Sequence, residues 1–437
     1  MKPFLHFWSL CIRPFHLVPS RFLPRPTRTR IPVLEVLENR CLLSATLQLT
    51  GAQSIVGGQN INVSNEPTSA QSEMSVDINP ADPLNVVGFS HDFGSGFNEI
   101  DVFYSTDGGA HWQTNTIDEV DDGQGTATSR RFDPSIAFAS NGDLYIAYGV
   151  DLGTQTKLIV ARSQDGGASF NRFTAVDTQN KVDSAQGVDK WLLATGPDPS
   201  SAGGQAVYVA YNQVVAETSG TDQRVVIVGS NDGWATFTLP VTINDASIGT
   251  SNTDLRNNFP DPAVGPDGEL YVSWVDYDSG LTTGSILLDR DLDGLFVATS
   301  AFGTDITVRT LVAPIFQRSV PAQPQRGIYN GPVLDADRSG GAFNGQLYIT
   351  FVDDCTACNG DNYDVFLAHS SDRGATWSNL GTNVGNLESA DSTDFLPWVD
   401  VDQKTGSVNV LYYTTDGDQT RDEENGISPI KLARCLG

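Results

Sequence analysis

The chain has 437 residues and an acidic balance, with 26 Lys and Arg against 53 Asp and Glu, so its formal net charge is −27. This charge repels phosphate backbones and excludes nucleic acid as an expected partner. No apolar run of about 18 residues occurs, so the sequence predicts no transmembrane helix.

The first 45 residues differ from the rest of the chain. Residues 1–44 carry seven basic and two acidic side chains, a net of +5, which leaves −32 on the remaining residues. Residues 34–45 (LEVLENRCLLSA) resemble an N-terminal export motif found ahead of secreted and surface proteins in some bacteria. We therefore expect residues 1–45 to be a basic export leader and the protein to be secreted or displayed on a bacterial cell surface. An unstructured basic tail is the alternative.

A short apolar phrase returns at intervals of about 60 residues. Alternating β-formers preceded by turn glycines indicate strands, and no helical periodicity accompanies them. Successive copies end 59, 63, 63, 77 and 61 residues apart. The copies are NVVGF at 85–89, LYIAY at 144–148, VYVAY at 207–211, LYVSW at 270–274, LYITF at 347–351 and VNVLY at 408–412.

A second phrase, Ser-x-Asp-x-Gly-x-x-aromatic, follows another strand in four of the units; the third copy has Trp in place of Gly. Asp and Gly between two β-runs indicate a hairpin in which the carboxylate accepts hydrogen bonds from its own turn. We therefore assign Asp107, Asp165, Asp232 and Asp372 a structural role. The copies are STDGGAHW at 105–112, SQDGGASF at 163–170, SNDGWATF at 230–237 and SSDRGATW at 370–377.

Each unit thus reads as strand, turn, strand, loop, strand, Asp phrase, strand. Four-stranded units repeated radially form a propeller with few exposed sheet edges. We predict an all-β fold, a six-bladed β-propeller of four-stranded antiparallel blades, over residues 46–437. The expected blades are approximately 70–117, 130–180, 186–243, 257–310, 327–385 and 393–437.

The last blade lacks an outer strand at the C-terminal end. Residues 430–435 (IKLARC) align with residues 158–163 (LIVARS), which form a third strand, and the sequence stops two residues later. We predict that the β-like segment 46–63 supplies the missing strand. A truncated or frameshifted reading is the alternative.

The Asp phrase is the Asp box of the sialidase-like Asp-box (BNR-repeat) β-propeller family, which this chain resembles. The resemblance implies an exported protein that recognises glycans and hydrolyses them as an exo-glycosidase. A sialidase needs three arginines on the substrate carboxylate, a Tyr nucleophile and an Asp acid. The candidates in the loops that enter the innermost strands are Arg131, Arg256, Arg326 and Tyr329, with Asp133 in the same loops or Asp92 in a joining loop as the acid.

This chain departs from the sialidase pattern at the first arginine. The family's Arg-Ile-Pro phrase occurs here only at residues 30–32, inside the leader. The same loops also carry more acids than bases, which repels an anionic sugar. A non-catalytic surface binding or adhesion propeller with an acidic, cation-binding rim is therefore the alternative. The expected binding residues on this face are Glu73, Asp189, Lys190, Asp261 and Asp394.

Few residues point to a metal or to redox chemistry. Asp289, Asp291 and Asp293 match the first half of a calcium loop, although Ser300 stands at the twelfth position, so Ca²⁺ is a candidate ligand and no cofactor is required. Cys355 and Cys358 are expected to form a local disulfide if the protein is exported. We expect a monomer whose partner is a glycan or cell-surface polymer.

Overall fold

The computed structural model describes the chain from residue 61 to residue 435, with gaps. Within this part the protein is an all-β, six-bladed propeller of antiparallel sheets, with one short helix, α1 (Glu119–Asp122). The described ranges are 61–65, 71–93, 99–126, 128–181, 187–217, 220–245, 257–278, 282–297, 301–313, 315–320, 323–354, 363–378, 382–383, 393–415 and 430–435.

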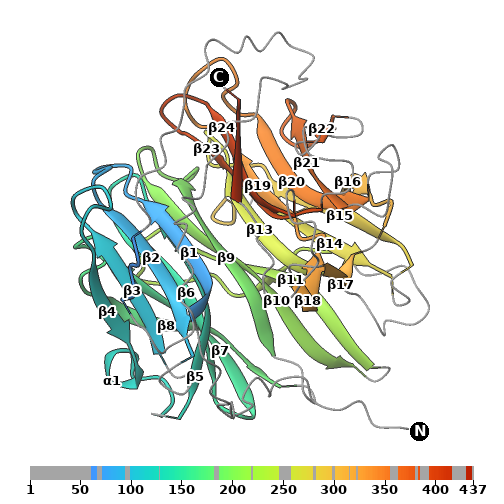
Figure 1. Cartoon of the computed structure of the whole chain (residues 1–437). Helices are drawn as coiled ribbons and strands as arrows, with labels where there is room; N and C mark the ends of the chain where they lie inside the picture. Colours follow the sequence, from blue (N-terminus) through green and yellow to red (C-terminus); the bar gives the residue numbers. More distant parts are fainter. Residues whose placement is uncertain are drawn as a thin grey trace, which may run out of the picture.

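The first three blades are four-stranded, and each follows the chain from an inner to an outer strand (Figure 1). The blades comprise β1 (Gln71–Ile78), β2 (Val86–Asp92), β3 (Glu99–Ser105) and β4 (Gln113–Ile117); β5 (Arg130–Phe138), β6 (Leu144–Asp151), β7 (Gln155–Ser163) and β8 (Asn171–Asn180); and β9 (Val188–Pro197), β10 (Gln205–Glu217), β11 (Gly220–Ser230) and β12 (Val241–Thr242).

The fourth and fifth blades are also four-stranded, and a two-stranded hairpin, β17–β18, stands between them. This hairpin accounts for the long step of 77 residues in the sequence repeat. The remaining strands are β13 (Asn258–Val264), β14 (Leu270–Tyr277), β15 (Gly284–Asp291), β16 (Ile306–Thr310), β17 (Phe316–Val320), β18 (Gln323–Tyr329), β19 (Val333–Ala336), β20 (Leu347–Asp354), β21 (Tyr363–Ser370), β22 (Thr382–Asn383), β23 (Asp394–Val401), β24 (Val408–Thr414) and β25 (Ile430–Cys435).

The sixth blade has three strands, β23 to β25, among the described residues. The segment predicted to complete it, 46–63, lies almost entirely outside the described residues; its last residues, 61–63, are not in a strand. The predicted leader, residues 1–45, and the disulfide candidates Cys355 and Cys358 also lie outside them. The described residues contain no helix long and apolar enough to cross a membrane.

The core consists of five apolar clusters, one between each pair of consecutive blades from the first to the sixth. Each strand buries alternate side chains against the next blade, which the period-2 pattern dictates. The face of β1 that points away from the second blade is exposed, with Met74 75 % and Val76 68 % accessible. Trp398 of the sixth blade is 50 % accessible.

Polar side chains join the innermost strands to one another. Asp77 accepts a hydrogen bond from the backbone N–H of Phe138 in the next blade at 2.7 Å, and Asp261 accepts one from Leu334 at 2.7 Å. Asp335 accepts one from Val401 at 2.8 Å. These bonds satisfy backbone donors that face a neighbouring sheet rather than a partner strand.

The four Asp boxes adopt one hydrogen-bonded turn. In the first, Ser105 Oγ donates to Asp107 Oδ1 at 2.9 Å, and the same carboxylate oxygen accepts from the His111 N–H at 2.9 Å. Corresponding bonds form around the other three Asp residues. In the third box Trp234 takes the left-handed backbone position that Gly occupies elsewhere, at φ 81°, and its ring stacks on Tyr145.

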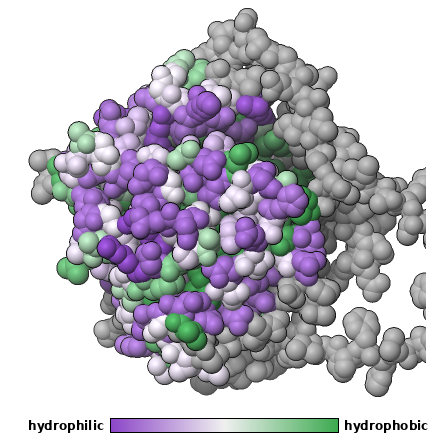
Figure 2. Space-filling view, turned by 90° about the vertical axis from the view of Figure 1, so that its left-hand side faces the viewer, coloured by the Kyte–Doolittle hydropathy of each residue, from purple (hydrophilic) through white to green (hydrophobic). Residues whose placement is uncertain are grey.

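The surface agrees with the acidic, polar composition. Figure 2 shows that the side of the molecule at the left of Figure 1 is mostly hydrophilic, with apolar residues scattered among polar ones. Single exposed apolar residues of this kind are ordinary on a folded protein.

Candidate functional site

The innermost strands share a bulge near their first residues. In five blades the first strand has one extra residue against its partner, and a residue other than Gly takes the left-handed conformation there. Such a conformation costs about 1 kcal/mol or more and persists only where surrounding contacts hold it. The five residues are Glu73, Asp133, Lys190, Phe259 and Leu396, with φ between 48° and 56°.

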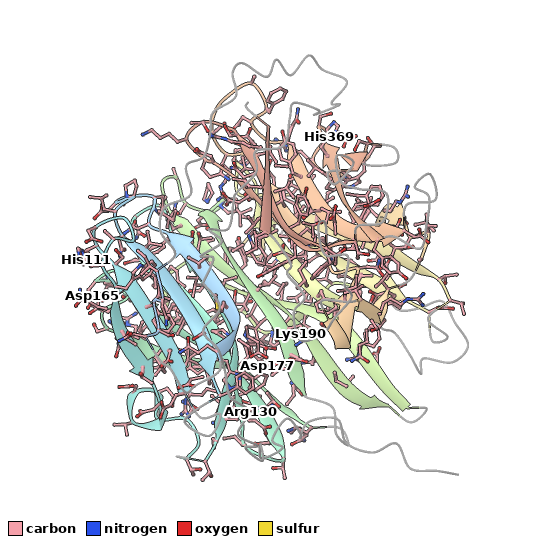
Figure 3. All side chains as sticks on the ribbon, in the orientation of Figure 1. His111, Arg130, Asp165, Asp177, Lys190 and His369 are labelled. Atoms are coloured by element: carbon pink, nitrogen blue, oxygen red, sulfur yellow. The ribbon has the colours of Figure 1, made fainter. Side chains whose placement is uncertain are left out.

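We call the end of the propeller where the inner strands begin the entry face. Strands alternate in direction within each blade, so the Asp boxes, which connect third and fourth strands, lie at the opposite end. In Figure 3 the Asp-box residues His111 and Asp165 are at the left edge, apart from Lys190. The bulges therefore lie at one end of the propeller, and the structural Asp-box turns lie at the other.

On the first three blades the bulge residues are charged and contact one another. Glu73 Oε2 accepts a hydrogen bond from the Asp133 backbone N–H at 3.0 Å and lies 3.0 Å from His91 Nδ1. Lys190 Nζ donates to Asp133 Oδ2 at 3.0 Å and lies 3.7 Å from Asp189 Oδ1. We call these five residues the carboxyl site.

The two bulge carboxyls share a side-chain hydrogen bond and are driven to opposite protonation states. Burial raises the pKa of Asp133 well above its usual range; Lys190 opposes this, and the negative charges of Asp189 and Glu73 add to it. Burial would also raise the pKa of Glu73, but hydrogen bonds from His91 and Asp133 lower it to about 2. The pair therefore holds one proton, on Asp133, beside an ionised Glu73.

Lys190 keeps its charge within this site. Burial alone would lower its pKa, but Asp189 and Asp133 raise it. The arrangement places a proton donor, a carboxylate and a fixed cation together on the first three blades of the entry face. These are the groups needed for general acid–base chemistry on a bound substrate.

A tryptophan fixes the backbone of Asp133 from the next blade. Trp191 Nε1 donates to the Asp133 carbonyl oxygen, and its ring lies 5.2 Å from the Phe132 ring. Gly149 leaves the space for both rings, since a Cβ there would lie 2.4 Å from Trp191. Sequence reasoning named Asp133, Glu73, Asp189 and Lys190 but missed His91, whose only signal was its place at the end of a second strand.

Arg131, the first predicted sialidase arginine, forms a buried ion pair inside the protein. Its side chain is fully buried, and its Nε and Nη2 donate to the two oxygens of Asp122 at 2.7 and 2.8 Å. Arg256 and the side chain of Arg326 lie outside the described residues. Of the three predicted arginines, the structure therefore places only the side chain of Arg131, and the convergence of the three stays a prediction.

Tyr329, the predicted nucleophile, lies at the end of the hairpin strand β18. Its ring lies 5.0 Å from that of Phe259 and 5.4 Å from that of Phe316. Two further predicted binding residues are buried. Asp261 is bonded to the next blade, and burial raises its pKa to about 8; Asp394, at the start of β23, has no accessible surface.

The candidate calcium residues do not form a cation cage. Asp289 Oδ1 accepts hydrogen bonds from the backbone of Arg290 and Gly303 at 2.7 and 3.1 Å, and Asp291 Oδ1 accepts one from Asp293. No group of three or more His, Cys, Asp or Glu is arranged for a metal within the described ranges. Calcium binding stays a prediction.

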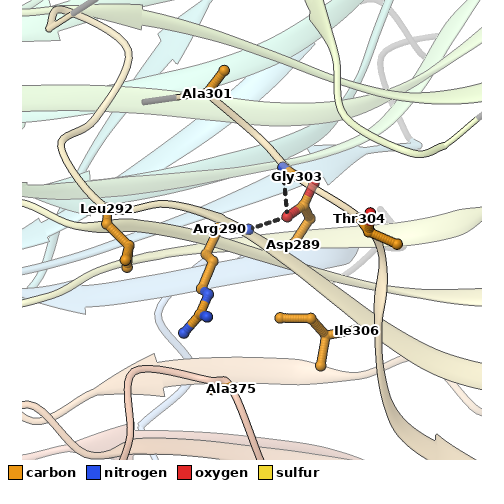
Figure 4. A pocket seen from close by; sticks show the side chains of 8 residues that line it. All are labelled: Asp289, Arg290, Leu292, Ala301, Gly303, Thr304, Ile306 and Ala375. Atoms are coloured by element: carbon orange, nitrogen blue, oxygen red, sulfur yellow. Dashed lines mark hydrogen bonds between the residues drawn. The ribbon is translucent and has the colours of Figure 1, made fainter. Parts of the chain in front are cut away.

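A cavity of about 390 Å³ lies beside Asp289, between blades four and five (Figure 4). Ala375 of the fourth Asp box lines it, so it belongs to the end opposite the entry face. The carboxyl site is thus separate from this cavity.

The fold and the carboxyl site define a six-bladed propeller with an acid–base pair at the entry face. No family model matches the chain, and no curated protein matches it. Among solved structures, the chain is similar to the GH93 α-L-arabinofuranosidase of Fusarium graminearum in complex with arabinobiose, with a TM-score of 0.52 and 11% identity, over 85% of this chain and 95% of that one.

Two other neighbours have similar scores. The intramolecular trans-sialidase of Ruminococcus gnavus, in complex with oseltamivir carboxylate, gives a TM-score of 0.51 at 12% identity, over 86% of this chain and 97% of that one. The α-L-arabinanase of Penicillium chrysogenum, complexed with arabinobiose, gives 0.50 at 13% identity, over 84% and 93%. At these identities the likeness shows the fold that the chain shares with sialidases and GH93 arabinanases.

Proposed function

We propose that this protein is a glycoside hydrolase and that the carboxyl site performs its chemistry. The observation that carries the proposal is the contact between Glu73 and Asp133, which lie on left-handed bulges of neighbouring blades; Glu73 Oε2 accepts the Asp133 backbone N–H at 3.0 Å, and His91 and Lys190 contact the two carboxyls. The opposite pKa shifts of the two carboxyls support it. Glycosidases use two carboxyl groups in opposite protonation states, one as acid and one as base or nucleophile. Solved neighbours that act on glycans support the same class.

In this proposal Asp133 is the general acid. Its proton is donated to the oxygen of the scissile glycosidic bond, which replaces Glu73 as the acceptor of the Asp133 hydrogen bond. Glu73, released from that bond and ionised, faces the positive charge that develops at the anomeric carbon. Asp133 loses its proton to the leaving group. A water then attacks the anomeric carbon; its hydroxyl completes hydrolysis, and its other proton passes to the Glu73 carboxylate and back to Asp133.

His91 and Lys190 position the pair. His91 Nδ1 contacts the Glu73 carboxylate, and the imidazole is only 1 % exposed. Lys190, on the third blade, donates a hydrogen bond to Asp133. Neither side chain has to touch the sugar for this role, so both are positioning residues.

The charges of the site favour neutral sugars over sialic acids. Arg131 is paired with Asp122, and the charge of Lys190 is balanced by Asp189. A substrate carboxylate would therefore meet an acidic site. Of the three predicted arginines only the Arg131 side chain is described, and it is already paired with Asp122. Arabinose-containing glycans, the ligands of two solved neighbours, are the first substrates to test.

Export to the cell surface remains part of the proposal and rests on the sequence of residues 1–45. It is tested by fractionating the native host and locating the chain with an antibody. Recovery of the intact protein from the cytoplasm alone would contradict it.

The test of the proposed function uses the full chain on a panel of aryl glycosides and oligosaccharides, including α-L-arabinofuranosides, arabinobiose and sialosides. We expect turnover of a neutral glycoside and a loss of about 10²-fold or more in Asp133→Asn, with binding retained. Asp82→Asn, at an exposed turn of the opposite end, is the matched control. Binding without turnover in the unaltered protein would instead favour the non-catalytic alternative.

A further inference from the structure

The entry face has a second, aromatic half. Phe259, on the fourth blade, occupies the same bulge position as Glu73 on the first, at φ 54° against 56°. In a six-bladed ring the fourth blade stands opposite the first. The bulge position on the blade opposite Glu73 therefore carries an aromatic residue rather than a charged one, and its ring packs beside Tyr329 and the apolar cluster between blades four and five.

Phe259 belongs to a cluster with two aromatic residues of the hairpin. Its ring lies 5.0 Å from Tyr329 with the planes at 59°, and Tyr329 lies 5.4 Å from Phe316 with the planes at 86°. All three side chains are partly exposed. Gly331 makes room for the cluster, because a Cβ there would lie 3.2 Å from the Phe259 ring.

The hairpin that carries Tyr329 is fixed to the fold at its base. Asn330 is fully buried; its Oδ1 accepts from the Ile315 N–H and from Tyr277 Oη, and its Nδ2 donates to the Val352 carbonyl at 2.6 Å. Tyr277 has one hydroxyl proton, which it shares between Asn330 Oδ1 and the Ile315 carbonyl, 2.8 Å away. Tyr329, the neighbour of Asn330, is thereby held against Phe259 by buried polar contacts rather than by a free loop.

From this arrangement we propose that Phe259 and Tyr329 form a stacking platform for the apolar face of a neutral sugar ring. Aromatic rings bind the C–H faces of sugars by burying apolar surface, while the hydroxyls at the ring edge turn to polar groups such as those of the carboxyl site. Tyr329 contributes its ring rather than its oxygen. This inference rests on the proposed function for the position of the scissile bond, but the platform itself requires only sugar binding.

The test measures binding apart from catalysis. Titration calorimetry is run on the Asp133→Asn full chain with arabinobiose and with a set of neutral oligosaccharides. We expect Phe259→Leu and Tyr329→Ala each to weaken the dissociation constant about tenfold. Tyr329→Phe, which keeps the ring, is expected to bind as tightly as the Asp133→Asn parent. Phe170→Leu, a partly exposed ring at an Asp box, is the matched control and should bind normally.

Three results would overturn the platform: unchanged affinity in Phe259→Leu, absence of binding by every neutral sugar, or loss of affinity in Tyr329→Phe, which would assign binding to the phenolic oxygen rather than to the ring. Should Phe259→Leu fail to fold by circular dichroism, Tyr329→Leu carries the same test. Failure of the proposed function gives a different pattern, since binding would depend on Phe259 and Tyr329 although no glycoside is cleaved.

Discussion

Residues of neighbouring blades hold both the backbone and the side chain of Asp133. Its N–H donates to Glu73, its carbonyl oxygen accepts from Trp191, and its carboxyl accepts from Lys190. These contacts come from two neighbouring blades and hold a left-handed conformation that an isolated Asp adopts at a cost. A proton donor fixed in this way needs little reorganisation when a substrate arrives.

The buried ion pair of Arg131 and Asp122 is expected to stabilise the fold. The Arg131 guanidinium and Asp122 form a fully buried pair, and Tyr148 Oη also donates to Asp122 at 2.8 Å. Arg131→Ala leaves Asp122 buried without its counter-ion, so we expect unfolding in urea to show a loss of about 3–5 kcal/mol. The double variant Arg131→Met/Asp122→Leu should recover most of that loss. A loss below about 1 kcal/mol in the single variant would show that the pair is not structural.

The sequence named Arg131 for catalysis because of its residue type and its place at an entry strand. Its partner, Asp122, lies in α1, a helical turn of four residues that carries no periodicity from which a helix could be recognised. Residue type and strand position therefore identified the region of the site. Which side chains form buried ion pairs, and so cannot bind substrate, depends on three-dimensional packing.

At the scale of elements, the repeated bulge organises the entry face. The extra residue in β1, β5 and β9 turns Glu73, Asp133 and Lys190 toward one another, and the same bulge in β13 presents Phe259. The apolar alternation that predicted these strands does not reveal the bulge, because it lies at the third or fourth residue of each strand and leaves too few residues before it to show a change of phase. The strands were predictable, and the grouping of their charged residues was not.

Gly149 tests the support of the bulge in β5. A Cβ on Gly149 would lie 2.4 Å from Trp191 and 2.6 Å from Phe132, so Gly149→Ala should displace both rings and cost about 1–3 kcal/mol. Gly88→Ala is the matched control from the second strand of the first blade, where the nearest atom would be 3.6 Å away. Chemical denaturation measures both. Equal stability of the two variants would mean that Trp191 has room to move and does not hold Asp133.

For the whole molecule, the fold could be predicted from the sequence because each sequence repeat forms one blade of the propeller. Six copies of a strand phrase at regular steps predicted the six-bladed propeller, which the structure confirms. The hairpin β17–β18 was not anticipated, since it appears in the sequence only as a longer step. The closing of the sixth blade by residues 46–63 remains a prediction.

The inner ring predicts how stability depends on pH. Burial raises the pKa of Asp77 to about 6, of Asp335 to about 7 and of Asp261 to about 8. Their unfolded pKa is about 3.9, so between about pH 4 and 8 the folded state holds protons that the unfolded state has lost. Stability should therefore fall as pH rises through this window.

The Asp boxes act in the opposite direction at lower pH. Turn hydrogen bonds lower the pKa of Asp107 to about 2, so their contribution is lost only as the pH falls below about 4. Melting temperatures measured from pH 3 to 9 should be highest near pH 4–5, and Asp261→Asn and Asp335→Asn should flatten the slope above that. A melting temperature that rises from pH 5 to 8 would contradict the burial of these carboxyls.

In the proposed function Glu73 and Asp133 act as a pair with one proton. This proposal is tested most directly by the pH dependence of kcat/KM for the neutral glycoside found in the panel. We predict activity on the acidic side that falls as rising pH removes the proton from Asp133, and a limb at low pH, where Glu73 is protonated, that moves upward in His91→Gln. A profile that is flat through this range, or turnover unchanged in Asp133→Asn, would place the chemistry elsewhere.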